Sequence, residues 1–189
     1  TTLAAVASTT SAGQVDLSWS NVISGPTGYK IVPYISTTAQ SLLIQTVPSN
    51  GLGTTSYSMT GLDNGTTYRF RVGAVYSGGE VVWSDYSADA VPYDLPAAPV
   101  AGTPVAGNSS VVLSWTAPAT NGRDISGYAI TISPAPTAGQ PAEVSGTSTS
   151  ATLTGLANGT EYSFAVAAKN LRGTGLSSDS VKQTVIFNF

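Results

Sequence analysis

The chain contains neither cysteine nor histidine, and charged residues make up only 9% of it. Without cysteine it has no disulfide, no thiolate nucleophile and no cysteine-based zinc site. Without histidine it lacks the usual general base and the commonest metal ligand. We therefore expect a protein that is not an enzyme, with no catalytic residues, no metal site and no cofactor.

The remaining candidates for chemistry are the ten Asp and Glu residues and the many Ser and Thr residues. A glycosidase needs two carboxyl groups in one cleft, but carboxylates such as Asp63 and Asp124 stand beside Asn-Gly pairs that predict turns. No Gly-x-Ser-x-Gly nucleophile elbow and no Asp-x-Asp-x-Asp-Gly calcium loop is present. The carboxylates are therefore interpreted as solvated turn residues.

Positive charge is also scarce, and long apolar runs are absent. The chain has 7 Lys and Arg residues and a net charge of −3. A nucleic-acid partner requires clustered cations that displace the counterions of the phosphates. A membrane-spanning helix requires about 18 or more consecutive apolar residues, and the sequence contains no such run. We expect neither a nucleic-acid partner nor a membrane span.

The sequence contains one long pattern of residues that occurs twice. Leu17–Trp19, the Gly-Tyr pair at Gly28 and the run Thr60–Val72 recur in the same order. Loops absorb insertions while core positions keep their order, so the pattern indicates two copies of one domain. We assign the first copy to residues 1–94, a Pro/Ala linker to 95–100 and the second copy to 101–189. The recurring segments are Leu113–Trp115, Gly127–Tyr128 and Thr154–Val166.

The local pattern within each copy is that of strands. In Tyr68-Arg69-Phe70-Arg71-Val72-Gly73-Ala74 the large apolar residues alternate with arginines, which is typical of a strand with one buried face. Turn-forming Asn-Gly pairs and Ser, Thr and Pro residues separate such runs. This spacing predicts an antiparallel all-β sandwich.

The ordered set Leu-Ser-Trp, Gly-Tyr and Thr-Gly-Leu-x-Asn-Gly-Thr-x-Tyr-x-Phe-x-Val-x-Ala resembles the fibronectin type III domain over nearly the whole chain. The sequence of the second copy resembles versions of this domain from bacterial secreted proteins and phage virion proteins. The resemblance implies an all-β chain of two tandem seven-stranded immunoglobulin-like sandwiches, with a tyrosine corner in each. It assigns these residues to the structural core: Trp19, Tyr29, Leu62, Tyr68, Trp115, Tyr128, Leu156 and Tyr162.

One surface of the first copy has no match in the second. Strand alternation directs Lys30, Tyr34, Arg69 and Arg71 outward on neighbouring strands, where the second copy has Ala, Ser and Thr. Trp83 is expected in a loop of the same copy, where the second copy has Gly175 and Leu176. Such a cationic and aromatic face is typical of a contact surface, but the same residues also stabilise a sheet by packing on one another. Both interpretations stay open from the sequence. The candidate residues are Lys30, Tyr34, Arg69, Arg71 and Trp83.

The end of the chain is a second deviation. Its candidate residues Ile186, Phe187 and Phe189 belong to an uncharged apolar segment that extends beyond the usual last strand of the family. An apolar strand end needs a cover, either its own sheet or a neighbouring subunit. We interpret it as an assembly tail.

These features favour a non-catalytic structural or adhesive surface module that acts through protein–protein contacts. Examples are a virion decoration, a fibre or a cell-surface filament, and its location is then extracellular, at a cell surface or at a virion surface. The partner is protein, through self-assembly or a larger surface assembly. The alternative is a spacer or weak carbohydrate-binding region of a secreted polysaccharide-degrading enzyme, with a glycan as partner. A receptor-like ectodomain is disfavoured by the absent cysteines.

Overall fold

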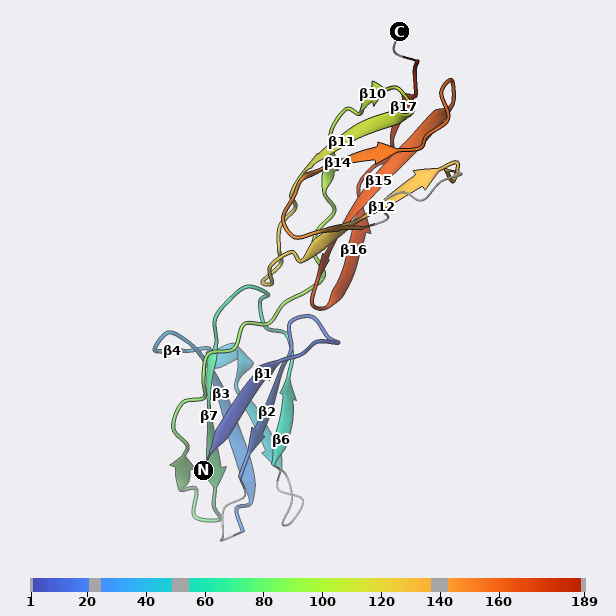
Figure 1. Cartoon of the computed structure of the whole chain (residues 1–189). Helices are drawn as coiled ribbons and strands as arrows, with labels where there is room; N and C mark the ends of the chain where they lie inside the picture. The colour runs from blue at the N-terminus through green and yellow to red at the C-terminus, as the bar shows by residue number, and fades with distance from the viewer. Residues whose placement is uncertain (1, 21–24, 49–54, 137–142, 188–189) are drawn as a thin grey trace. The chain divides into compact units, whose positions relative to one another are not determined.

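The computed structural model describes residues 2–20, 25–48, 55–136 and 143–187. The chain forms two compact units, Thr1–Asp94 and Leu95–Phe189. In the described residues of both units the regular elements are antiparallel strands, apart from one short 3₁₀ helix, η1 (Ser41–Leu43) (Figure 1). The all-β class and the two tandem immunoglobulin-like sandwiches that the sequence predicts are confirmed.

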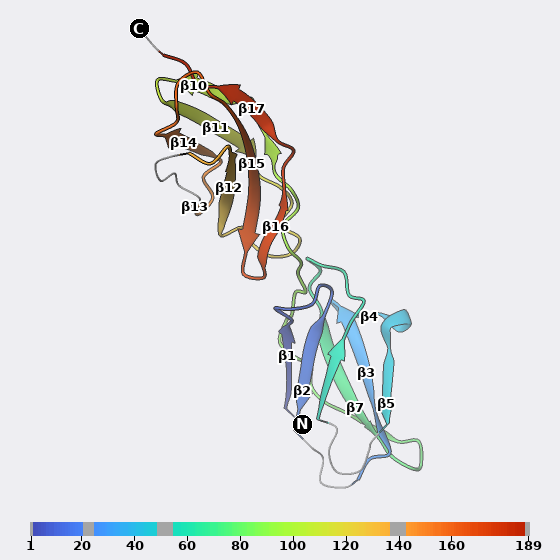
Figure 2. The same cartoon turned by 90° about the vertical axis from the view of Figure 1, so that its right-hand side faces the viewer.

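The first unit consists of two layers of strands (Figure 2). One sheet has the order β1-β2-β6, and the other has the order β4-β3-β7-β8 with β5 also paired to β3. The strands are β1 (Leu3–Ala7), β2 (Val15–Trp19), β3 (Gly28–Ile35), β4 (Thr38–Ala39), β5 (Gln45–Pro48), β6 (Ser56–Met59), β7 (Arg69–Val75) and β8 (Val81–Trp83).

The second unit repeats this arrangement. Its first sheet has the order β10-β11-β14 with β9 beside β11, and its second has the order β13-β12-β15-β16 with β17 also paired to β15. The strands are β9 (Val100–Ala101), β10 (Val105–Gly107), β11 (Ser110–Thr116), β12 (Gly127–Ser133), β13 (Glu143–Ser145), β14 (Ser150–Thr154), β15 (Glu161–Asn170), β16 (Gly173–Ser177) and β17 (Val181–Thr184).

Each core follows from the two-residue alternation of its strands. In β2 the side chains of Val15, Leu17 and Trp19 are buried, whereas Asp16 and Ser18 are exposed. Successive side chains of a strand point to opposite faces, so the apolar ones meet the second sheet. β11 buries Val111, Leu113 and Trp115 in the same way.

A tryptophan and a tyrosine join the two sheets of each unit. Trp19 of β2 and Tyr29 of β3 have ring centroids 5.2 Å apart, and Trp115 of β11 and Tyr128 of β12 have centroids 5.0 Å apart. Both indoles are 5% exposed. Neither indole N–H has a hydrogen-bond acceptor among the described residues. The stabilisation by these rings therefore comes from buried area and ring contact.

A tyrosine hydroxyl holds the turn before β7 and its counterpart before β15. The Tyr68 hydroxyl accepts a hydrogen bond from the backbone N–H of Asp63 at 3.1 Å, and the Tyr162 hydroxyl accepts one from Ala157 at 3.1 Å. Leu62 and Leu156 are buried next to these turns. Each hydroxyl satisfies a backbone donor near the edge of a core, which is why tyrosine suits these positions better than phenylalanine.

The segment 95–100, for which the sequence predicts a linker, is part of the second compact unit. The Asn121 side-chain N–H₂ donates to the Leu95 carbonyl at 2.8 Å, and the Ala97 N–H donates to the Ala119 carbonyl at 3.1 Å. A Cβ atom at Gly175 of β16 would lie 2.1 Å from the Pro96 carbonyl oxygen. Glycine at position 175 therefore permits this segment to run directly against the edge of the sheet.

Truncation of the central indole tests the first core. We expect Trp19→Ala to lower the free energy of unfolding of the first unit by about 3–5 kcal/mol, because it leaves a large cavity between the sheets. Chemical denaturation followed by circular dichroism measures this loss. Val6→Ala, at a side chain that is 64% exposed, is the control, with an expected change within about 0.5 kcal/mol. A loss below about 1 kcal/mol for Trp19→Ala contradicts the central role of the indole.

Candidate functional site

The candidate surface lies on the outer face of the sheet formed by β3, β7 and β8 of the first unit. Lys30 of β3 lies opposite Gly73 of β7, which in turn lies opposite Trp83 of β8. Tyr34 of β3 lies opposite Arg69 of β7. The strand register therefore brings side chains from distant parts of the sequence to one face.

Four outward side chains of the first unit form a continuous stack, which we call the arginine–aromatic stack. The Arg71 guanidinium carbon lies 5.5 Å from the ring centroid of Trp83 and 5.3 Å from that of Tyr86. Tyr34 meets Tyr86 edge-on, with centroids 5.1 Å apart and planes at 81°. The guanidinium thus lies against two aromatic rings, an arrangement favoured by the negative potential of their faces. The stack consists of Trp83, Arg71, Tyr86 and Tyr34.

Glycine at position 73 leaves room for the indole of Trp83 on the sheet. A Cβ atom at Gly73 would lie 2.9 Å from the Cε3 atom of Trp83 and 2.4 Å from the Cγ1 atom of Val81. Such distances are too short for any side chain, so the ring fits only because position 73 is glycine. The equivalent pair in the second unit is Ala167 opposite Ser177, a larger residue facing a smaller one.

The segment after β8 follows β7 with an unusual period. The N–H groups of Ser84, Ser87 and Ala90 donate to the carbonyls of Val72, Phe70 and Tyr68, each at 2.9 Å. The segment therefore advances three residues for every two of β7. Extended backbone with three residues per turn presents every third side chain on the same side. Trp83, Tyr86 and Asp89 consequently project together beside the outward residues of β7.

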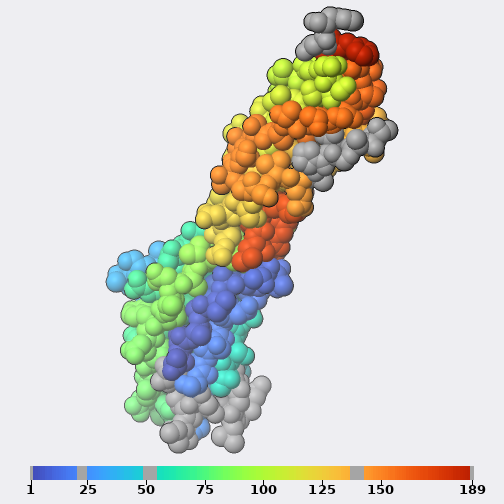
Figure 3. Space-filling view, viewed as in Figure 1, coloured from blue at the N-terminus to red at the C-terminus, as the bar shows by residue number. Residues whose placement is uncertain are grey.

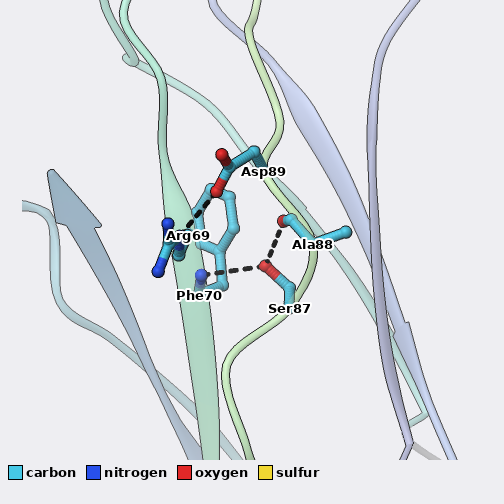
Figure 4. A network of polar contacts seen from close by, with 5 residues as sticks. All are labelled: Arg69, Phe70, Ser87, Ala88 and Asp89. Carbon is cyan, nitrogen blue, oxygen red and sulfur yellow. Dashed lines mark hydrogen bonds and ion pairs between the residues drawn. The ribbon is translucent and has the colours of Figure 1, made fainter. Parts of the chain in front are cut away.

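Two serine side chains complete the hydrogen bonding of β7 in this arrangement. The Val72 N–H donates to the Ser84 hydroxyl at 3.0 Å, and the Phe70 N–H donates to the Ser87 hydroxyl at 3.0 Å. Both hydroxyls donate to the next backbone carbonyl of their own segment. Figure 4 shows the Ser87 contacts with Phe70 and Ala88. Because these buried backbone groups must be satisfied, the serines hold the segment in place.

An ion pair lies at the Arg69 end of this segment. The Arg69 Nε atom donates to the Asp89 carboxylate at 2.5 Å (Figure 4). Both side chains are about half exposed, at 48% and 54%. An exposed pair of this kind contributes little to stability, about 0–1 kcal/mol. Its effect on the surface is to neutralise Arg69.

The five candidate residues therefore have different surroundings. Tyr34, Arg71 and Trp83 belong to the stack, Arg69 is paired with Asp89, and Lys30 lies on the same face with no ion-pair partner in the described part of the chain. The alternation of strand residues did not predict that Tyr86 and Asp89 belong to this surface. The available signal was the three-residue spacing of Trp83, Tyr86 and Asp89, together with that of Ser84 and Ser87.

The second unit lacks the stack although its core is alike. Ser178 makes the same contacts as Ser84, accepting from the Val166 N–H at 3.1 Å and donating to the Asp179 carbonyl. Val181 then takes the place of Ser87 and begins the regular strand β17, opposite Phe164. Small residues stand where the stack would be: Ser133, Ala165, Ser177 and Ser180.

The tail residues lie at one end of the second unit. Val185 is fully buried, and its backbone exchanges hydrogen bonds with Gly159 and Thr160. Ile186 forms a parallel bridge to Asn108, and the two surrounding segments lie side by side in Figure 3. Ile186 and Phe187 are 46% and 65% exposed. Phe189 lies outside the described residues.

The described residues lack two other features that could indicate a function. They contain no group of three acidic side chains that could hold a metal ion. Helices long and apolar enough to cross a membrane are also absent from the described residues. The arginine–aromatic stack and the adjoining ion pair are the candidate contact features of the first unit.

Several known proteins are similar to this chain. The chain is 37% identical to human (Homo sapiens) Neogenin and 36% identical to rat (Rattus norvegicus) Neogenin, each over 130 residues that make up 66% of this chain. It covers only 9% of the length of these relatives. The crystal structure of the chicken CNTN1 FN1-FN3 domains covers 97% of this chain and 66% of its own, at 20% identity and a TM-score of 0.41.

The family itself is shown by a direct match to each half of the chain. The profile of the fibronectin type III domain matches residues 2–89 and, a second time, residues 96–184. Together these matches include both buried tryptophans, both tyrosine corners and the whole arginine–aromatic stack. The chain therefore belongs to the fibronectin type III family and carries two consecutive copies of its domain.

Proposed function

We propose that this pair of domains is a non-catalytic contact module, which binds a protein partner through the outer face of β3, β7 and β8 in the first unit. The surface consists of the arginine–aromatic stack with Lys30 and Arg69. Domains of this family generally serve as protein-interaction modules or spacers. Their typical extracellular location supports a site of action outside the cell. We propose a cell surface, a filament or a virion as that site.

One observation carries the proposal: the second unit has the same fold without the stack. The second unit builds the same sandwich around Trp115 and Tyr128 with Ala165 and Ser177 in place of Arg71 and Trp83. Aromatic side chains and arginine are also the residues that contribute most to protein interfaces. Large side chains that the fold does not require, gathered on one face, are best explained by a partner.

The alternative, weak carbohydrate binding, has less support from the same geometry. Stacking on a sugar requires an aromatic ring with an open face. Arg71 lies over the rings of Trp83 and Tyr86. The rings of Tyr34 and Tyr86 also contact each other edge to face. The ring edges, hydroxyls and guanidinium that stay accessible suit a protein surface better.

The addition of a single methyl group at position 73 tests how Trp83 and Arg71 pack on this surface. We expect Gly73→Ala to displace the Trp83 indole and so to separate it from Arg71, because the added Cβ would collide with the ring. In solution NMR, the upfield ring-current shift of the Arg71 side-chain protons is then reduced, and the part due to Tyr86 remains. Gly78→Ala, at a position where a Cβ meets nothing within 4 Å, is the control. An unchanged Arg71 shift in Gly73→Ala contradicts the packing described above.

Selection of binding peptides tests the proposed function. A displayed library of random peptides is selected against the whole chain, in parallel with a variant carrying Tyr34→Ala, Arg71→Ala, Trp83→Ala and Tyr86→Ala. We expect families of peptides that bind the native chain and lose binding to the variant, because the anchors of an interface carry most of its energy. Circular dichroism checks that the variant stays folded. Recovery of only those peptides that bind both proteins contradicts the proposal.

The tail supports a second contact, with another copy of the chain or a neighbouring subunit. Ile186 and Phe187 are exposed beyond Val185, the last core residue among those described. We expect deletion of residues 186–189 to lower self-association while the monomer stays folded, because Val185 and its hydrogen bonds remain. Size-exclusion chromatography with light scattering over a range of concentrations measures the association. Unfolding of the truncated chain would show instead that the tail belongs to the core.

A further inference from the structure

The chemistry of the partner can be inferred from the groups that this face leaves unsatisfied. We propose that the surface recognises an acidic peptide segment, in which an Asp or Glu carboxylate binds Arg71 and Lys30 and a neighbouring apolar side chain packs beside Ile35. The inference rests on the proposed function, since it names the partner class of the same surface.

Arg71 is held ready to bind a carboxylate. Its Nε atom donates to the Ser84 carbonyl at 2.9 Å, and its guanidinium lies against Trp83 and Tyr86. The two terminal amino groups have no acceptor among the residues that the structure describes. A guanidinium fixed in this way loses little conformational freedom on binding, and its paired N–H groups match the two oxygens of a carboxylate.

The charge of the face differs from that of the whole chain. Lys30 and Arg71 point outward from adjacent strands, and neither has an ion-pair partner in the described ranges. The chain as a whole carries a net charge of −3. A local positive site favours an acidic partner segment over neutral or basic ones.

The surface beyond Arg69 favours a peptide over a uniformly charged polymer. A shallow depression of about 340 Å³ is lined by Ile35, Ser36, Thr67, Arg69 and Asp89. Ile35 and the aliphatic part of Arg69 offer apolar contact beside the charged groups. A sulfated polysaccharide or a nucleic acid carries negative charge along its whole length and would therefore meet the Asp89 carboxylate in this depression. A peptide with an acidic and an apolar residue side by side fits both features.

The test uses peptides from the selection described above, synthesised with a fluorescent label, and the whole chain. We expect the stack-dependent peptides to carry Asp or Glu beside a large apolar residue. Replacing that acidic residue by its amide should raise the Kd about tenfold or more, because a charge-assisted hydrogen bond is lost. Fluorescence anisotropy at about 50 mM and about 500 mM NaCl should show weaker binding at the higher salt concentration.

Two matched variants of the protein isolate the effect of charge from the effect of packing. Asp89→Asn releases Arg69 from its ion pair without touching the stack, and we expect it to lower the Kd about two- to fivefold. Glu161→Gln releases Lys182 from an exposed ion pair in the second unit and should leave the Kd unchanged. Lys30→Ala should raise the Kd, whereas Lys182→Ala should not.

The outcomes separate this inference from the proposed function. Stack-dependent peptides that are neutral, insensitive to salt and indifferent to Asp89→Asn overturn the acidic-peptide inference and leave the contact module standing. Heparin that binds with the same dependence on Arg71 and Lys30, while the acidic peptides fail to bind, also overturns it in favour of a polyanion. Absence of any stack-dependent peptide removes the proposed function and, with it, this inference.

Discussion

Each unit of this chain depends on one indole that spans the gap between two sheets. A sandwich interior is about 10 Å thick, so it needs large side chains that reach from one sheet to the other. Trp19 does this from β2 and Trp115 from β11, and each meets a tyrosine of the opposite sheet at about 5 Å. With no disulfide in the chain, this packing and the strand hydrogen bonds hold the sheets together.

A second constraint determines what lies outside the core. The outer edge of β7 carries backbone N–H and C=O groups that must find partners. In the first unit, Ser84 and Ser87 supply both their backbone and their hydroxyl groups to it, three residues apart. This spacing leaves Trp83, Tyr86 and Asp89 on the outside, where they meet Arg71 and Arg69. The hydrogen bonding of the fold thus produces the surface that we propose for binding.

The two units show how one fold separates structure from function. Their cores correspond residue by residue at the tryptophan, the tyrosine corner and the alternating strands. Their outer faces differ, because outward side chains are free of the packing requirements of the core. Where the first unit has Ser87 in an extended three-residue repeat, the second unit has Val181, which begins the regular strand β17. The surface of one copy can therefore acquire a contact function while the other keeps small residues.

Several properties followed from the sequence alone. Alternation in Val15–Trp19 and in Tyr68–Ala74 indicated strands with one buried face, and the doubled pattern indicated two sandwiches. These properties are local, since the direction of each side chain along a strand is determined by the two-residue period. The same reasoning placed Lys30, Tyr34, Arg69 and Arg71 on one outer face, as the register of β3 with β7 has them.

The tertiary structure determines contacts that the two-residue period of a single strand does not predict. The position of Tyr86 over Arg71, the ion pair of Arg69 with Asp89 and the space above Gly73 depend on a segment that pairs three residues with two. Residues 95–97 likewise read as a proline-rich connector, yet their contacts with Ala119, Asn121 and Gly175 arise only when the second sandwich is closed. The sequence determined which way each side chain faces along its own strand. Which neighbours it meets depends on hydrogen bonds between segments that are distant in the chain, and those form only in the folded sheet.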